Sequence, residues 1–190
     1  MKATVIGASG YSGGELLRLI AAHPHFQLHG AIAHTSAGEK IAAVHPHLAS
    51  SHSGSFESFT AELIDSSDLL FFALPHGESG KIISDHKELF ASKKIIDLGA
   101  DFRLTSTSQW EKYYGGKHYG VWQYGLPELP GQREKIRAST HIANPGCYAT
   151  ALTLALAPFT QVVGKVNLSD VVITAASGTT GAGRSAKINL

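Results

Sequence analysis

The chain has 190 residues, of which 43% are hydrophobic and 16% are charged, and its formal net charge is +1. This composition predicts a globular protein with its own core and argues against nucleic acid or a membrane surface as a partner. No apolar run reaches the roughly 18 residues of a transmembrane helix, and the single cysteine excludes an internal disulfide and favours a reducing, cytoplasmic location.

Strand and helix signals alternate along the first hundred residues. A β-branched run at 3–6 predicts a strand ending at Gly7, and the apolar spacing at 15–22 predicts a helix. By the same criteria we expect strands at 26–33, 69–74 and 94–98, and a helix at 79–90. This alternation predicts an α/β fold with a doubly wound, Rossmann-type parallel sheet that has helices on both faces.

The pattern changes between 105 and 130, where aromatic residues crowd into a segment with little periodicity. We interpret it as an aromatic-anchored excursion over the strand ends. A nucleic-acid stacking platform is the alternative, but basic residues are too few there to support it.

The last part of the chain predicts a second unit. A strand ending at 141–143 leads to a helix at 149–157, and 166–176 reads as a strand of a different sheet. We therefore expect a dinucleotide-binding domain at 1–146 and the incomplete start of an α+β substrate domain at 147–190. Because so short a second unit cannot close a core, we expect the sequence to be a fragment of a longer enzyme.

A glycine motif with the spacing G-x-x-G-x-x-G lies between the first strand and the first helix. Glycines there allow a tight turn and a close backbone approach, so the helix N-terminus can receive a pyrophosphate. A purely structural glycine turn is the alternative. The predicted cofactor-binding residues of this loop are Gly7, Ser9, Gly10, Tyr11, Ser12 and Gly13.

The end of the second strand indicates which dinucleotide is bound. About 20 residues past the glycine loop, an acidic side chain would bind the ribose 2′-OH of NAD. The segment at 34–38 instead reads His-Thr-Ser-Ala-Gly, and the first carboxylate comes at Glu39. We therefore predict NADP, with Thr35 and Ser36 near its 2′-phosphate.

The cysteine, Cys147, follows Asn144-Pro145-Gly146 and opens a helix-compatible segment. A helix N-terminus presents unpaired N–H groups and a positive dipole end, which favour thiolate over thiol. The alternative is a small buried hydrophobe. The position after a strand and a Pro-Gly turn favours a nucleophile at the carboxyl edge of the sheet.

Eleven histidines require a metal site to be considered. The segments 23–25 and 45–47 both read His-Pro-His. Because neither has an acidic or thiol partner at a ligand-like spacing, we interpret these residues as exposed loop histidines and expect no metal site.

Several separated motifs resemble the N-acetyl-γ-glutamyl-phosphate reductase family of the semialdehyde dehydrogenase superfamily. They are G-A-S-G-Y-S-G-G-E-L-L-R-L at 7–19, A-L-P-H-G at 73–77, D-L-G-A-D-F-R-L at 97–104, Y-G-L-P-E-L at 124–129, N-P-G-C-Y-A-T at 144–150 and S-G-T-T-G-A-G-R at 177–184. The resemblance covers nearly the whole chain. It implies the reduction of an acyl phosphate to an aldehyde with NADPH in arginine biosynthesis, through a thioester on Cys147.

The resemblance also implies roles for other residues. Arg103 would clamp the substrate phosphate, with a surface salt bridge to Asp101 as the alternative. Asn144 would orient the substrate or form the turn before Cys147. Pro75 would lie beneath the nicotinamide, Gly178 would lie near the cofactor, and Ser177 and Arg184 would contact the substrate.

Two other functions stay open at this point. Aspartate-semialdehyde dehydrogenases share the glycine loop and an Asn-Pro-x-Cys element, and a non-catalytic NADP-binding module would need no reactive cysteine. The family's acid–base histidine lies downstream of the 177–184 loop, and the chain ends at Leu190. We therefore expect little turnover from these residues alone, and a homo-oligomer for the full-length protein.

Overall fold

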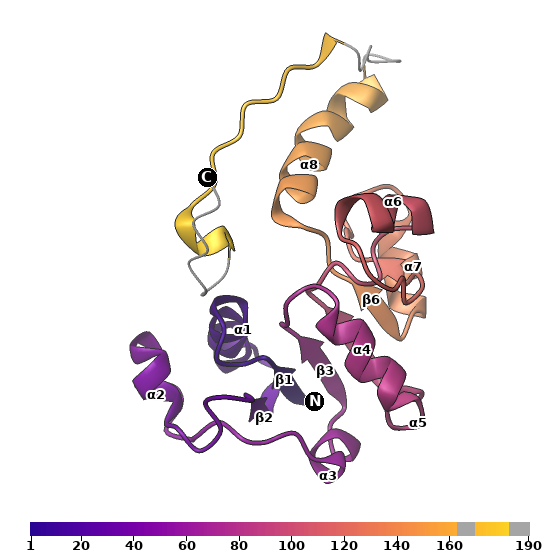
Figure 1. The fold of residues 1–190 in the computed structure, drawn as a ribbon. Helices are drawn as coiled ribbons and strands as arrows, with labels where there is room; N and C mark the ends of the chain where they lie inside the picture. The colour runs from indigo at the N-terminus through magenta and orange to yellow at the C-terminus, as the bar shows by residue number, and fades with distance from the viewer. Residues whose placement is uncertain (163–169, 183–190) are drawn as a thin grey trace.

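The structure, a computed structural model, describes residues 1–162 and 170–182 (Figure 1). Its centre is a sheet in the order β2-β1-β3-β4-β6-β5, and every neighbouring pair of strands is parallel. The strands are β1 (Lys2–Ile6), β2 (Gln27–Ile32), β3 (Leu69–Phe72), β4 (Lys94–Asp97), β5 (Gln123–Tyr124) and β6 (His141–Ala143). The doubly wound α/β fold is confirmed, with strands one or two residues shorter than several of the predicted runs.

The centre of the sheet is buried on both faces, which explains the continuous apolar sequence of β3. Successive strand residues point to opposite faces, so Leu69 and Phe71 of β3 join one core while Leu70 and Phe72 join the other. Helix α1 (Tyr11–Ala22), α2 (Ile41–Val44) and the 3-10 turn η1 (Pro46–Leu48) cover the first face. The second face is covered by α3 (Ala61–Asp65), α4 (Glu78–Asp85) and α5 (Lys87–Phe90).

The helix predicted at 79–90 is two helices, and the single-helix prediction is wrong. The break is at His86, whose φ of −125° and ψ of 43° are not helical. After the break, Phe90 turns into the core, where its ring lies 5.5 Å from that of Phe72. Burying this aromatic side chain stabilises the arrangement of two helices over a single continuous helix.

The aromatic segment contains α6 (Thr107–Tyr113) and returns to the sheet as the edge strand β5; α7 (Gln132–Ala138), which was not predicted, follows. Its tryptophan rings pack as expected, whereas Tyr113 is 65% and Tyr114 is 42% exposed. Trp122 stacks on Phe102 with 3.7 Å between ring centroids, and Trp110 is 1% exposed. The ring of Tyr119 lies against α4, where a Cβ at Gly80 would overlap it.

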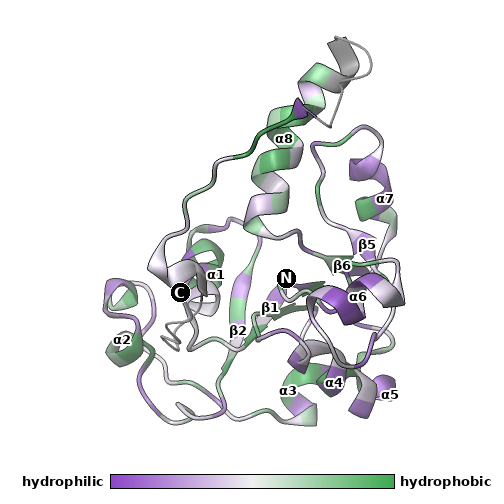
Figure 2. Ribbon diagram, turned by 45° about the horizontal axis from the view of Figure 1, so that its top comes forward, coloured by the Kyte–Doolittle hydropathy of each residue, from purple (hydrophilic) through white to green (hydrophobic). Residues whose placement is uncertain are grey.

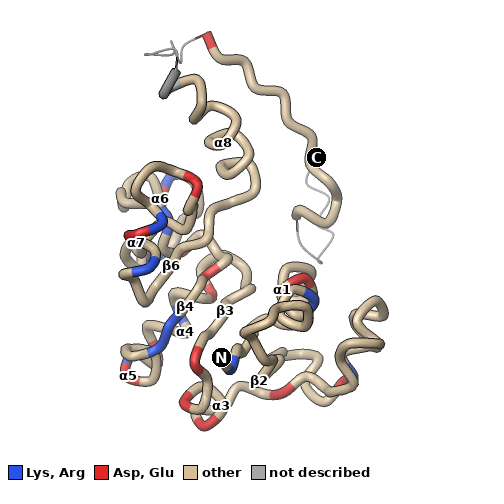
Figure 3. The backbone as a smooth tube through the Cα atoms, turned by 180° about the vertical axis from the view of Figure 1, so that it is seen from behind, with Lys and Arg blue, Asp and Glu red and all other residues tan. Residues whose placement is uncertain are grey.

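Helix α8 (Cys147–Val162) begins two residues before the predicted helix and projects away from the sheet (Figure 1). It is mostly apolar (Figure 2) and carries no charged residue (Figure 3). Among its large side chains, Phe159 is 56% exposed. No helix in the described parts of the chain is long and apolar enough to cross a bilayer.

The strand predicted at 166–176 is wrong for the residues that are described. Residues 170–176 do not form a strand, and Val172 is 91% exposed; residues 166–169 lie outside the described part. A strand needs a neighbour to satisfy its backbone groups, and the segment instead returns from the far end of α8 toward the α1 side, ending in η3 (Thr179–Ala182) (Figure 1).

Candidate functional site

The carboxyl ends of β1, β3, β4 and β6 meet at one edge of the sheet. Their last residues are direct partners, since Ile6 pairs with Phe72, Phe72 with Asp97, and Asp97 with Ala143. The loops that follow these strands therefore start side by side. In open parallel sheets this edge is where ligands bind.

The glycine loop after β1 is held close to its own helix. Gly7 has a φ of +87°, a conformation that other residues rarely adopt, and its N–H donates to the Ile32 carbonyl at 3.0 Å. A Cβ at Gly13 would overlap the Gly7 carbonyl and lie 2.7 Å from Ala8 Cα. Gly10 is different, because the nearest atom to its added Cβ is 3.5 Å away. The loop therefore fits a dinucleotide pyrophosphate, which would approach the backbone at Gly10 and the exposed start of α1.

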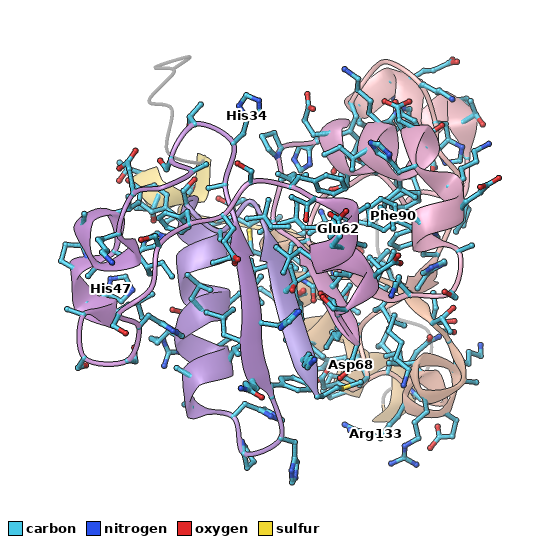
Figure 4. All side chains as sticks on the ribbon, turned by 90° about the horizontal axis from the view of Figure 1, so that it is seen from below. His34, His47, Glu62, Asp68, Phe90 and Arg133 are labelled. Carbon is cyan, nitrogen blue, oxygen red and sulfur yellow. The ribbon has the colours of Figure 1, made fainter. Side chains whose placement is uncertain are left out.

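The turn after β2 lies beside this loop, because the register pairs Ile32 of β2 with Ile6 of β1. Thr35 is exposed and Ser36 is partly exposed. His34 points outward (Figure 4). Hydroxyl groups and an imidazole therefore line this turn, ahead of the carboxylate of Glu39.

The turn after β3 carries Pro75 and His76. The Nδ1 of His76 accepts the Ala100 N–H at 3.1 Å, so the neutral ring carries its proton on Nε2. Partial burial lowers the pKa of His76, the Arg103 cation lowers it further, and Asp101 opposes both. His76 is therefore neutral near pH 7 and presents an N–H donor.

Asp101 ties this turn to the loop after β4. Its Oδ1 accepts the Gly77 N–H and its Oδ2 accepts the Gly80 N–H, both at 2.7 Å, and the side chain is fully buried. The carboxylate thus caps α4, for which the N-cap residue Gly77 has no side chain to offer. Sequence reasoning missed this role, because no local pattern distinguishes a buried aspartate from an exposed one.

Arg103 lies on the same loop and reaches the turn before Cys147. Its Nε donates to the Asn144 carbonyl and its Nη2 to the Leu98 carbonyl, both at 2.7 Å. Its Nη1 lies beside Gly146, where an added Cβ would come within 3.2 Å. The guanidinium therefore bonds to backbone carbonyls, and the carboxylate of Asp101 is engaged elsewhere, so the salt bridge between them does not form.

Cys147 is exposed and is the first residue of α8. Gly146 precedes the helix, and its carbonyl accepts the N–H and the hydroxyl of Thr150, both at 2.9 Å. The Asn144 N–H donates to the Asp97 carbonyl at 2.8 Å, which continues the sheet ladder by one bond. The alternative of a buried cysteine is wrong, and the thiol stands at a helix N-terminus over the sheet edge.

Asp97 ends β4 beneath these loops and is fully buried. Burial raises its pKa to about 6, although the Gly99 N–H counters the shift. The Gly99 N–H donates to its Oδ1 at 3.0 Å. This carboxyl group is the second residue of the site that sequence reasoning missed.

The residues of the last predicted loop lie apart from this cluster. Ser177 and Gly178 are exposed, and the Gly181 N–H donates to the Gly178 carbonyl at 3.0 Å. Within the described residues, no hydrogen bond joins Ser177 or Gly178 to Cys147. Arg184 lies outside the described residues.

The prediction of exposed histidines is wrong for one residue. His23, His25 and His47 are exposed, but His45 is 6% exposed, since its ring packs against Phe56 and the glycine loop. In the described part of the chain, no group of three histidine, cysteine or acidic residues could hold a metal ion.

A family model described as the semialdehyde dehydrogenase NAD binding domain matches residues 2–139. The chain belongs to the semialdehyde dehydrogenase family. A second model, the dimerisation domain of the same family, matches residues 147–190. The projecting helix α8 therefore lies in the part of the chain that matches the family's dimerisation domain.

Similar curated proteins are named N-acetyl-gamma-glutamyl-phosphate reductase. That of Salinispora tropica is 52% identical over 190 residues, covering 100% of this chain and 56% of the relative. That of Acidothermus cellulolyticus is 54% identical over 189 residues, covering 100% and 54%. The chain spans about half the length of these relatives.

Solved structures of the family share the fold. Aspartate semialdehyde dehydrogenase with NADP from Candida albicans has a TM-score of 0.55 at 17% identity, covering 86% of this chain and 48% of that one. Aspartate semialdehyde dehydrogenase II from Vibrio cholerae has a TM-score of 0.56 at 16% identity, covering 85% and 42%. This likeness shows the fold, and the family model, an NAD binding domain, supports a nicotinamide cofactor bound by residues 2–139.

Proposed function

We propose that the protein is an N-acetyl-γ-glutamyl-phosphate reductase, which reduces an acyl phosphate to an aldehyde with NADPH. One observation carries the proposal: an exposed cysteine starts a helix at the sheet edge, and the turn before it is bonded to a half-buried arginine. The names of relatives about 50% identical to this chain point to the same reaction.

The glycine loop and the turn after β2 would hold the cofactor. The lack of a side chain at Gly10 leaves space for a pyrophosphate, and the exposed start of α1 offers N–H groups and a positive dipole end to it. Thr35 and Ser36 would donate hydroxyl groups to a 2′-phosphate, and the absence of a carboxylate at 34–38 removes a repulsive charge. These features favour NADP over NAD.

The chemistry would begin at Cys147. Its thiolate attacks the acyl carbon, so a carbon–sulfur bond forms while the carbon–oxygen bond to phosphate breaks and phosphate leaves. Arg103 has an Nη1 group beside Gly146, from which it would meet the phosphate oxygens. The N–H groups at the start of α8 would stabilise the thiolate and the developing oxyanion.

When bound, NADPH supplies the hydride that reduces the thioester. The carbon–sulfur bond then breaks, the aldehyde leaves, and Cys147 returns to its thiolate form. His76 is not proposed as the acid–base group, because its Nδ1 is engaged by the Ala100 N–H. Little turnover by the 190 residues alone stays a prediction.

The test is phosphorolysis by the full product of the gene, with NADP⁺ and inorganic phosphate. N-acetylglutamate semialdehyde should be oxidised and aspartate semialdehyde should not; the reverse preference would favour an aspartate-semialdehyde dehydrogenase. Cys147→Ser should remove the activity while leaving NADPH binding unchanged. A Cys147→Ser protein with full activity would exclude the thioester route, and a wild-type protein that only binds NADP(H) would indicate a non-catalytic module.

A further inference from the structure

A buried histidine lies under the cofactor loop. His45 sits between α2 and η1 and is 6% exposed, and its Nε2 lies 2.9 Å from the carbonyl oxygen of Ala8. Because a carbonyl oxygen can only accept, Nε2 must carry a proton and donate it. The two residues are 37 positions apart, so this bond joins the glycine loop to a separate segment of the chain.

The same ring limits what can occupy the first turn of α1. A Cβ at Gly14 would lie 2.6 Å from Cε1 and 2.7 Å from Nδ1 of His45. Real Cβ atoms do not approach so closely, so the glycine is needed to admit the ring. Phe56 lies against the imidazole with 6.0 Å between ring centroids. His45 is thus held between the core and the loop.

The bond to Ala8 sets the orientation of a peptide group in the loop. The Ala8–Ser9 peptide is trans, so its C=O and N–H point in opposite directions. With the carbonyl held by His45, the Ser9 N–H faces away from the histidine. The next residue, Gly10, has open space where a side chain would stand, and its own N–H donates to the Gly7 carbonyl at 3.2 Å.

We propose that His45 is a positioning residue for the pyrophosphate of the cofactor. Its Nε2–H keeps the Ala8 carbonyl turned inward, so that this carbonyl oxygen does not face an anion bound between the loop and the start of α1. The inference depends on the proposed NADP binding. It adds a residue that neither the glycine motif nor the family match points to.

The test compares two substitutions of one residue. His45→Phe keeps a flat ring against Gly14 and Phe56 but cannot donate, whereas His45→Gln restores an N–H donor without the ring. His47→Phe, in the exposed neighbour, is the matched control. The ligands are NADPH and adenosine 2′-monophosphate, which lacks the pyrophosphate, and both are titrated against wild type and variants, with thermal unfolding recorded for each.

We expect His45→Phe to raise the Kd for NADPH about tenfold, a loss of about 1.4 kcal/mol. The Kd for adenosine 2′-monophosphate should not change, and His45→Gln should recover most of the NADPH affinity. Equal NADPH affinity in wild type and His45→Phe would overturn the proposal, as would equal losses for both ligands, which indicate general destabilisation.

A second variant covers the case in which His45→Phe does not fold. Gly14→Ala pushes the ring away from Ala8 without changing the histidine and should show the same selective loss. A folded Gly14→Ala protein with wild-type NADPH affinity would overturn the proposal. If the wild-type protein itself binds no NADPH, the proposed cofactor is wrong, and that result is distinct from a failure of His45 alone.

Discussion

Arg103 and Asn144 are joined by a hydrogen bond from the guanidinium Nε to the backbone carbonyl at 2.7 Å. A second bond, from Nη2 to the Leu98 carbonyl, has the same length. Together they bind the loop after β4 to the turn that leads into Cys147. The arginine therefore positions the turn before the thiol as well as offering a charge to an anion.

Arg103→Lys should separate geometry from charge. Lysine keeps the positive charge but cannot make both bonds in the plane of a guanidinium. We expect kcat/KM for the acyl phosphate to fall about a hundredfold, about 2.7 kcal/mol of transition-state stabilisation. The control is Arg133→Lys, in an exposed residue of α7 (Figure 4). Unchanged kcat/KM in Arg103→Lys would mean that the charge alone suffices.

Asp101→Asn should loosen the turn that carries His76. An asparagine offers one acceptor oxygen, so one of the buried N–H groups of Gly77 and Gly80 would lose its partner. We expect a loss of about 2 kcal/mol in the free energy of unfolding, measured with denaturant. Asp85→Asn at the exposed end of α4 should change it by less than about 0.5 kcal/mol. Equal effects of the two substitutions would contradict the capping role.

Asp97 should make stability depend on pH. Its pKa is raised from 3.8 to about 6, so the folded state binds more protons than the unfolded state between these values. The free energy of unfolding should therefore fall as pH rises from about 4 to about 6. Below about pH 4 the carboxyl group of Asp97 is protonated in both states, and its contribution to the free energy of unfolding is fully present.

Asp97→Asn should remove this dependence. We expect the free energy of unfolding of the variant, relative to that of the wild type, to increase as pH rises, by up to about 3 kcal/mol at pH 7. The lowered pKa of His76 acts in the opposite direction on acidification, but both proteins contain His76, so its effect cancels in the difference. If the free energies of unfolding of the wild type and of Asp97→Asn differ by the same amount at every pH from 4 to 7, Asp97 ionises normally.

Two alanine substitutions in the cofactor loop should affect different properties, one the stability of the fold and the other the affinity for NADPH. At Gly13 the new Cβ would overlap backbone that cannot move aside, so we expect a loss of about 2 kcal/mol in stability. At Gly10 the backbone has a φ of −76° and the Cβ has room, so the fold should be kept. The ligand site would be blocked instead, and the Kd for NADPH should rise about tenfold. Wild-type affinity in Gly10→Ala would place the pyrophosphate elsewhere.

The predictions from sequence agree with the structure where the signal is local. The buried strand at 69–72 stands out as an apolar run, and β6 has the predicted end residues. The strand predicted at 166–176 was wrong in its described part, because an apolar β-branched run does not reveal whether a neighbouring strand is present to pair with it.

The features of the site likewise divide into those that local sequence predicts and those that it does not. The glycine loop and the Pro-Gly-Cys turn could be recognised because each needs only a few adjacent residues in a restricted conformation. The supporting contacts could not be recognised. His45 is 37 positions from Ala8, Asp101 is 24 from Gly77, and Arg103 is 41 from Asn144.

The sequence by itself determined the parallel α/β architecture, the turn that can receive a dinucleotide and the cysteine that opens a helix, since periodicity and glycine spacing are properties of short segments. Only the tertiary structure decided which side chains hold those elements in place. Strand order brings the ends of β1, β3, β4 and β6 together, and burial there favours hydrogen-bond partners that are distant in the chain, such as the Asp101 carboxylate for the Gly77 and Gly80 N–H groups.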